Sequence, residues 1–143
     1  MLQADDAIAP CERKGTMDYR LELVPIPVSD VDRAKAFYAE KVGFNVDLDV
    51  NADTDPRLSD DRRVVQLTPP GSACSIAFGI GIIDTPPGSV QGLHLVVSDI
   101  NAARAELVER GVRVGEVQDL GGILYAPFSD PDGNGWTLQQ LPY

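Results

Sequence analysis

The side chain best suited to acid–base chemistry in this sequence is His94, the only histidine of the chain. An imidazole with a pKa near neutrality can act as a general base or form a hydrogen bond to a ligand. A lone histidine more commonly satisfies a local hydrogen bond at an interface between modules or subunits, and the sequence leaves these interpretations open. One histidine is too few for the three-His, two-His-one-Glu and two-His-one-carboxylate sites that bind zinc or iron in enzymes. A conventional catalytic transition metal is therefore not expected.

Other side chains that could contact a small molecule lie on segments expected to be strands. Thr137 and Gln139 are two positions apart, and side chains with that spacing point to the same face of a strand. Hydroxyl and amide groups can orient a ligand by hydrogen bonding, and aromatic rings can stack on a planar one. Ordinary roles at a solvated sheet edge or in the core fit these residues too. The remaining candidates are Gln66, Ser75, Tyr125 and Trp136.

Composition limits the kind of partner. The 143 residues correspond to one domain, in which 43% hydrophobic residues suffice for a core. No apolar run approaches the ~20 residues that cross a bilayer. Twelve basic against 22 acidic residues give a net charge of −10, which disfavours nucleic acids and anionic membranes as partners. A small molecule or another protein is expected instead. Without a signal-peptide pattern, the expected compartment is the cytoplasm, with Cys11 and Cys74 as free thiols.

Hydropathy patterns predict regular structure from Tyr19 onward. A first strand is followed by a helix that Asp30 can cap and Gly43 can end. The apolar residues of this helix recur at helical spacing and include Phe37 and Tyr38, which are expected to pack in the core. Three further strands follow. The predicted ranges are 19–28 for the first strand, 30–42 for the helix, and 44–50, 63–68 and 74–80 for the later strands.

The second half of the chain repeats this order. Val28-Ser29-Asp30 returns as Val97-Ser98-Asp99, 69 positions later, and Gly43 is matched by Gly111. A period of this length is typical of a duplicated module. Strands are predicted at 93–97, 112–117, 123–128 and 136–141, with a helix from 98 to Gly111. The predicted organisation is a flexible extension (1–17) and a single domain (18–143) made of module one (19–80), a linker (81–90) and module two (91–142).

Three segments of this repeat together match a known pattern: VPIPVSDVDRAKAFYAEKVGF (24–44), GLHLVVSDINAARAELVERGVRV (92–114) and FSDPDGNGWTLQQLP (128–142). With these segments in this order, the chain resembles the vicinal oxygen chelate superfamily, which includes glyoxalase I, extradiol dioxygenases, and bleomycin and fosfomycin resistance proteins. The resemblance implies an α+β fold class. Two tandem βαβββ modules would form curved mixed sheets around a cavity that binds a small molecule.

In metal-dependent members of that superfamily, His, Glu or Gln side chains on the first and last strands of each module bind the ion. The resemblance places these positions at Leu23, Ala77, Gly92 and Thr137. Ser75 replaces Ala77 if the strand register shifts by one pleat. None of these is a usual metal-binding side chain, so neither a metal nor another cofactor is expected. Lewis-acid chemistry of the glyoxalase or dioxygenase kind therefore does not carry over. His94, two positions after Gly92, is expected to face the same cavity.

Several functions stay open at this point. The leading expectation is a homodimer that binds a small organic ligand in a metal-free cavity, for sequestration or resistance, the ligand being aromatic if Tyr125 and Trp136 stack on it. The alternative is a metal-independent lyase or isomerase in which His94 is the base and Gln139 or Tyr125 orients the substrate. A third is a metal-dependent glyoxalase or dioxygenase with non-standard ligands. A purely structural interaction module is a further interpretation.

Overall fold

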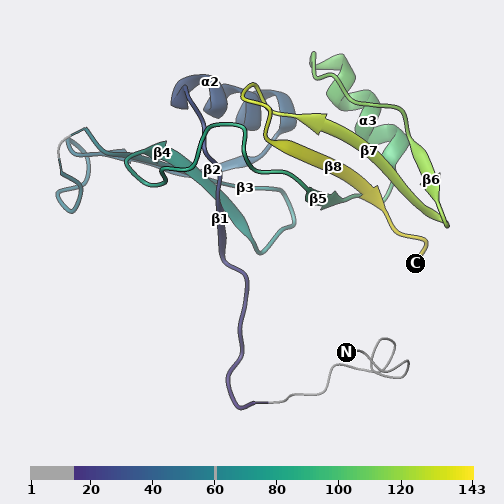
Figure 1. Ribbon diagram of the computed structural model, residues 1–143, viewed down its shortest axis with the longest axis horizontal. Coiled ribbons are helices and arrows are strands. Elements are labelled where there is room, and N and C mark those ends of the chain that lie inside the picture. The colour runs from purple at the N-terminus through teal and green to yellow at the C-terminus, as the bar shows by residue number, and fades with distance from the viewer. Residues whose placement is uncertain (1–14, 60) are drawn as a thin grey trace.

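The computed structural model describes residues 15–59 and 61–143, so most of the predicted extension (1–17) and Cys11 lie outside the described residues. Cys74 is a free thiol. The chain forms two units, each with one strand, a helical segment and three strands (Figure 1). The first unit contains β1 (Leu23–Pro25), α2 (Val31–Ala36), η1 (Phe37–Val42), β2 (Asn45–Asn51), β3 (Arg63–Thr68) and β4 (Ser75–Ile80). The second contains β5 (Leu93–Val96), α3 (Ile100–Glu109), β6 (Gln118–Leu120), β7 (Ile123–Ser129) and β8 (Gly135–Gln140).

Each unit folds into a four-stranded mixed sheet. The first sheet has the order β1-β4-β3-β2, in which β1 is parallel to β4 and the other pairs are antiparallel. The second sheet repeats this arrangement as β5-β8-β7-β6. The helices lie along one side of the two sheets (Figure 1). The predicted α+β fold class with two mixed sheets is confirmed, and each sheet has a helix-covered face and an open face.

The helices begin where the sequence predicts. The carboxylate of Asp30 accepts a hydrogen bond from the backbone N–H of Arg33 at 3.0 Å, and Asp99 caps α3 in the same way. The first helix differs from the prediction after Ala36, where it widens into the π-helix η1 and ends at Gly43 with φ +95°. A π turn inserts one extra residue per turn, and both Phe37 and Tyr38 are buried here. Within the described ranges, no helix has the length and apolar character needed to cross a membrane.

Both modules contribute to a single core on the helix-covered side of the sheets. Tyr38, at 0% exposure, lies at its centre. Its ring centroid is 5.7 Å from those of Phe44 and Phe78 in module one and 5.8 Å from that of Trp136 in module two. The rings of Trp136 and Phe128 stack at 6.2 Å. The aromatic side chains that the sequence assigns to helix packing therefore also hold the two modules together.

One predicted strand is wrong. Residues 112–117 make only an isolated bridge between Val114 and Phe128, and the strand that pairs with β7 is the later β6. Pro127 explains the interruption, because proline has no N–H to donate to a ladder. Its carbonyl accepts from the N–H of Gly115 at 2.7 Å, and a Cβ on Gly115 would lie only 2.9 Å from the Pro127 ring. This close approach replaces regular pairing with a local contact.

The first strand is shorter than predicted. Pairing with β4 extends from the carbonyl of Glu22, which accepts from Ser75, to the N–H of Ile26, which donates to Ala77 at 2.8 Å. Residues 15–21 carry no regular secondary structure and lead away from the body of the molecule (Figure 1). We call residues 15–22 the N-terminal arm. Three large apolar side chains of the arm are exposed: Met17 (68%), Tyr19 (91%) and Leu21 (72%).

Candidate functional site

Four of the predicted ligand-contacting residues meet on the open face of the second sheet. His94 on β5 is the register partner of Thr137 on β8, and Gln139 on β8 is the partner of Tyr125 on β7. Side chains of partnered residues lie on the same face of a sheet. The rings of His94 and Tyr125 are 6.1 Å apart and nearly perpendicular, an edge-to-face arrangement that aromatic pairs favour. We call these four residues the histidine face.

The hydrogen bond of His94 fixes which nitrogen faces solvent. Its Nδ1 lies 2.8 Å from the carbonyl oxygen of Gly92. A carbonyl only accepts, so Nδ1 carries the proton, and in the neutral ring Nε2 is left as an acceptor. Gly92 has φ +85°, a backbone conformation that only glycine adopts at little cost. In this conformation its carbonyl oxygen meets Nδ1 of His94. His94 is exposed, so its Nε2 is accessible to a ligand.

Trp136 is separated from the histidine face. It neighbours Thr137 on β8 and therefore points to the opposite side of the sheet, where it is 4% exposed. Its indole Nε1–H donates to the hydroxyl of Tyr38 at 2.9 Å. Trp136 is therefore a core residue, which is one of the two roles that the sequence left open for it. Of the two candidate aromatic residues, Tyr125 is the one whose ring lies on the histidine face.

Gln66 and Ser75 lie on the open face of the first sheet, in a polar chain with two residues that sequence reasoning did not select. The hydroxyls of Ser75 and Thr68 are 2.6 Å apart, and Thr68 also donates to the carboxylate of Asp47. Gln66 reaches the same carboxylate at 3.4 Å. Ser75 is buried. A ligand could therefore reach only the other three side chains of this hydrogen-bonded row, which are Asp47, Thr68 and Gln66. A register shift in β2 between Val46 and Leu48 brings Asp47 to this position, a bulge that the sequence pattern did not indicate.

Three of the four positions at which the resemblance leads us to expect metal ligands carry no side-chain donor atom. Leu23 and Ala77 lie on the first sheet, Ala77 opposite Pro25, and Gly92 precedes β5. These three residues have no side-chain donor atom, and the hydroxyl of Thr137 alone is a weak ligand. Across residues 15–59 and 61–143, no three His, Cys, Asp or Glu side chains gather where they could hold a metal.

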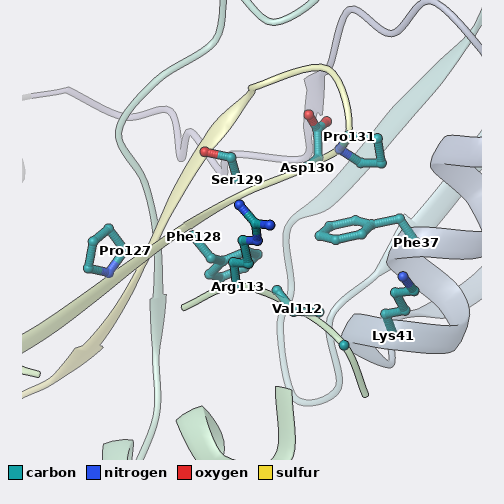
Figure 2. A pocket seen from close by; sticks show the side chains of 10 residues that line it. Phe37, Lys41, Val112, Arg113, Pro127, Phe128, Ser129, Asp130 and Pro131 are labelled. Carbon is teal, nitrogen blue, oxygen red and sulfur yellow. The ribbon is translucent and has the colours of Figure 1, made fainter. Parts of the chain in front are cut away.

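Cavities lie at two places between the modules. A pocket of about 260 Å³ runs from the turn at Pro69–Ser72 to β5 and includes His94, and a neighbouring one of about 360 Å³ continues toward α3. A larger cavity, about 620 Å³, lies elsewhere, between η1, the segment after α3 and the β7–β8 loop (Figure 2). None of the residues predicted to contact a ligand lines this cavity.

Comparisons with known proteins agree with this architecture. The sequence profile described as "Glyoxalase/Bleomycin resistance protein/Dioxygenase superfamily" matches residues 20–138. TnmS3, an antibiotic binding protein from Streptomyces sp. CB03234, is 35% identical with a TM-score of 0.76, over 89% of this chain and 99% of that one. A glyoxalase/bleomycin resistance protein from the same organism is 37% identical with a TM-score of 0.71, over 85% of this chain and 100% of that one.

A superfamily member from Sphaerobacter thermophilus DSM 20745 is 32% identical with a TM-score of 0.72, over 87% of this chain and 99% of that one. A comparison with curated proteins finds no significant match. Sequence profile, identity and fold agree over nearly the whole described chain. The protein belongs to the glyoxalase/bleomycin resistance protein/dioxygenase superfamily.

Proposed function

We propose that this protein binds a small planar organic molecule on the histidine face and sequesters it without chemical change. The observation that carries the proposal is the edge-to-face pair of His94 and Tyr125 beside the polar groups of Thr137 and Gln139, on a sheet face open to solvent. An apolar ring with a few convergent hydrogen-bonding groups is the usual composition of a site for small organic molecules. The similarity to an antibiotic binding protein supports a ligand of this kind.

The groups on the histidine face define what the ligand must offer. The Nε2 atom of His94 accepts a hydrogen bond, the Gln139 amide both donates and accepts, and the ring of Tyr125 provides a flat apolar surface. A planar aromatic molecule with phenol and carbonyl groups satisfies all three. On the open face of the first sheet, Asp47 and Thr68 provide additional acceptors. We infer that no metal takes part, since three of the four positions that the resemblance assigns to metal ligands have no side-chain donor atom and the fourth offers only the hydroxyl of Thr137.

We further infer that the site is completed in a homodimer. In one chain the histidine face and the open face of the first sheet are uncovered, and Val96 beside His94 is 60% exposed. The N-terminal arm adds three exposed apolar side chains on alternate positions. An extended segment with one apolar edge is stabilised by adding to a sheet of another chain. A second copy supplies both the cover for the open faces and a sheet for the arm.

A titration with planar aromatic antibiotics tests the binding proposal. Doxorubicin is the first probe, because its own fluorescence changes when it is bound, and 150 mM NaCl limits attraction to the acidic surface. We expect saturable binding that Tyr125→Ala and His94→Ala each weaken about tenfold, while Tyr143→Ala, which removes an exposed tyrosine elsewhere (96%), leaves it unchanged. If neither doxorubicin nor a panel of neutral polycyclic aromatics binds saturably, the proposal fails.

A second candidate function, a metal-independent lyase or isomerase, rests on the accessible Nε2 atom of His94, which can accept a proton. Mass spectrometry separates it from binding. If a bound compound is recovered unchanged after prolonged incubation, the protein is a binding protein; if it is converted and His94→Ala abolishes the conversion, the protein is an enzyme. Native mass spectra of the purified protein also report bound metal, and a stoichiometric transition metal would support metal-dependent chemistry with non-standard ligands.

A further inference from the structure

The cavity shown in Figure 2 lies between η1, the segment after α3 and the β7–β8 loop, and no residue of the histidine face lines it. It is about 620 Å³ and is formed by both modules, with Phe37 and Lys41 from η1 on one side and Arg113 and Phe128 from module two on the other. The ring of Phe37 lies between the Lys41 amine and the Arg113 guanidinium (Figure 2). The Nζ atom of Lys41 is 3.9 Å from the place where a Cβ on Gly111 would sit, so the cation reaches module two directly.

Lys41 and Arg113 are cations without a partner. Across residues 15–59 and 61–143, neither side chain makes an ion pair or a hydrogen bond, whereas most of the other described Lys and Arg side chains do. The chain has a net charge of −10, so carboxylates are plentiful on its surface. Two unpaired cations at one cavity therefore make a local positive site on an acidic protein. Such a site attracts small anions.

The one carboxylate that lines this cavity makes no ion pair with Lys41 or Arg113. Both oxygens of Asp130 are already used: Oδ2 accepts from the Tyr38 hydroxyl at 2.7 Å and from the Asn134 amide at 2.8 Å. Oδ1 accepts from the backbone N–H groups of Asp132 and Asn134 at 2.9 and 2.8 Å. The carboxylate points away from the Arg113 guanidinium (Figure 2). Four donors fill its acceptor sites and hold it in the core.

Apart from Ser129, the other side chains that line the cavity are apolar. The rings of Phe37 and Phe128 are 6.5 Å apart, and Pro127 and Pro131 also line the cavity. Ser129 is exposed and adds a hydroxyl donor. We propose that this cavity is a second binding site, which takes a small aromatic anion such as an aromatic carboxylate. The guanidinium of Arg113 pairs with the anionic group, the ring of the ligand packs against Phe37, and the ammonium of Lys41 on the other side of that ring adds electrostatic attraction.

The test compares two probes of the same shape, the anion 2-naphthoate and the neutral 2-naphthamide, by NMR titration of the ¹⁵N-labelled protein. We expect 2-naphthoate to shift amide signals of residues 111–114 and 127–131 and to bind at least tenfold more tightly than the amide. Lys41→Gln and Arg113→Gln each weaken the binding of 2-naphthoate about fivefold. The matched control is Arg62→Gln, which removes the same charge from an exposed position outside this cavity.

Three results would overturn the proposal: equal affinity for the two probes, no saturation with 2-naphthoate, or equal weakening by the Arg62 control. The histidine face is tested in the same titration. If signals of β5 and β8 shift and Tyr125→Ala weakens binding while the Lys41 and Arg113 variants do not, the aromatic anion binds only at the histidine face. The cavity shares no residue with the histidine face, so the proposal for one site can fail while the proposal for the other holds.

Discussion

At the scale of single residues, the hydroxyl of Tyr38 connects the two modules inside the core. It donates to Asp130 at 2.7 Å and accepts from the indole of Trp136 at 2.9 Å. Tyr38→Phe leaves the buried Trp136 N–H without an acceptor, which costs about 1–3 kcal/mol of unfolding free energy. Urea unfolding followed by Trp136 fluorescence measures this loss. Tyr125→Phe is the control, and we expect a change below about 0.5 kcal/mol for that half-buried tyrosine. Equal losses in the two variants would contradict the argument.

The same side chain makes stability depend on alkaline pH. Burial, followed by the neighbouring Asp130 carboxylate, raises the pKa of Tyr38 far above its ordinary value of 10.0. A group whose pKa is raised by folding stabilises the protein fully below the pKa of the unfolded state and loses that contribution as the pH rises above it. We therefore expect the unfolding free energy of the wild type to fall above pH 10 more steeply than that of Tyr38→Phe. Parallel pH profiles of the two proteins would show that Tyr38 does not titrate in this way.

Strand parity predicts most of the histidine face, since Thr137 and Gln139 are two positions apart on one strand. The same parity places Trp136 on the opposite face of β8, so alternation along this strand already favours a core position for its ring. Asp47 could not be predicted, because the register shift in β2 depends on how that strand pairs with β3. The cations Lys41 and Arg113 are 72 positions apart, and only the packing of the two modules brings them to one cavity.

At the scale of elements, α2 is attached to the first sheet by a charge network. The Asp49 carboxylate on β2 accepts from Lys35 at 2.8 Å and from Arg63 at 2.8 and 2.9 Å, and Arg63 also reaches Asp32. The hydrogen bond from Arg63 is the main reason that the pKa of Asp49 lies well below its usual range, with Lys35 acting in the same direction. A carboxylate whose pKa is lowered by folding stabilises the fold above the unfolded-state pKa of about 3.9. This contribution to the unfolding free energy is lost as the pH falls.

Asp49→Asn tests this attachment. We expect a loss of about 1 kcal/mol at pH 7, since the site is partly open to solvent. The difference from wild type should shrink progressively below pH 4, where the wild-type contribution is itself disappearing. Unfolding by urea at a series of pH values measures both quantities. Asp55→Asn is the control, because its partner Arg57 lies two positions away in the same exposed loop and joins no separate elements. A pH-independent loss in Asp49→Asn would rule out the charge network as its cause.

The N-terminal arm exposes three large apolar side chains, and the inferred homodimer gives them a function. Replacing Tyr19 and Leu21 together by Ser removes apolar area that the second copy would cover, at roughly 25 cal/mol per Å². We expect the dimer to dissociate at least tenfold more readily in sedimentation velocity experiments, with the monomer still folded. Leu120→Ser changes an exposed leucine (61%) on β6 and serves as the control. An unchanged dimer in the double variant would show that the arm takes no part in association.

The limits of prediction at this scale also have physical causes. Seven of the eight strands and both helix starts follow from alternation, caps and glycine terminators. The strand predicted at 112–117 fails because Pro127, on the neighbouring strand, removes a donor that pairing requires. Periodicity within one segment carries no information about the residue that it will meet on another. The π-helix escapes prediction for a similar reason, since its wider turn buries Phe37 and Tyr38 against aromatic rings of both modules.

At the scale of the whole molecule, the loop between β7 and β8 fastens module two to the start of the first helix. The carboxylate of Asp132 accepts from the N–H and hydroxyl of Ser29 at 3.1 and 2.5 Å. The amide of Asn134 donates to the carbonyl of Pro27 at 2.9 Å, and its oxygen accepts from Val90 in the connecting segment. This loop is the DPDGN motif of the sequence. Its polar residues satisfy backbone groups of the other module, so it acts as a clamp between the two halves of the repeat.

The shared core and the clamp together predict that neither half of the repeat folds alone. A fragment of residues 15–80 contains all four strands of the first sheet but lacks the rings of Trp136 and Phe128, which cover Tyr38 and Phe37. With fewer than 70 residues and an uncovered core, it cannot bury enough apolar surface to offset chain entropy. We expect a ¹H–¹⁵N spectrum without dispersion for this fragment, and one cooperative unfolding transition for the full chain by both Trp136 fluorescence and circular dichroism. A dispersed fragment spectrum, or two separate transitions in the full chain, would show that the duplicated modules are independent folding units.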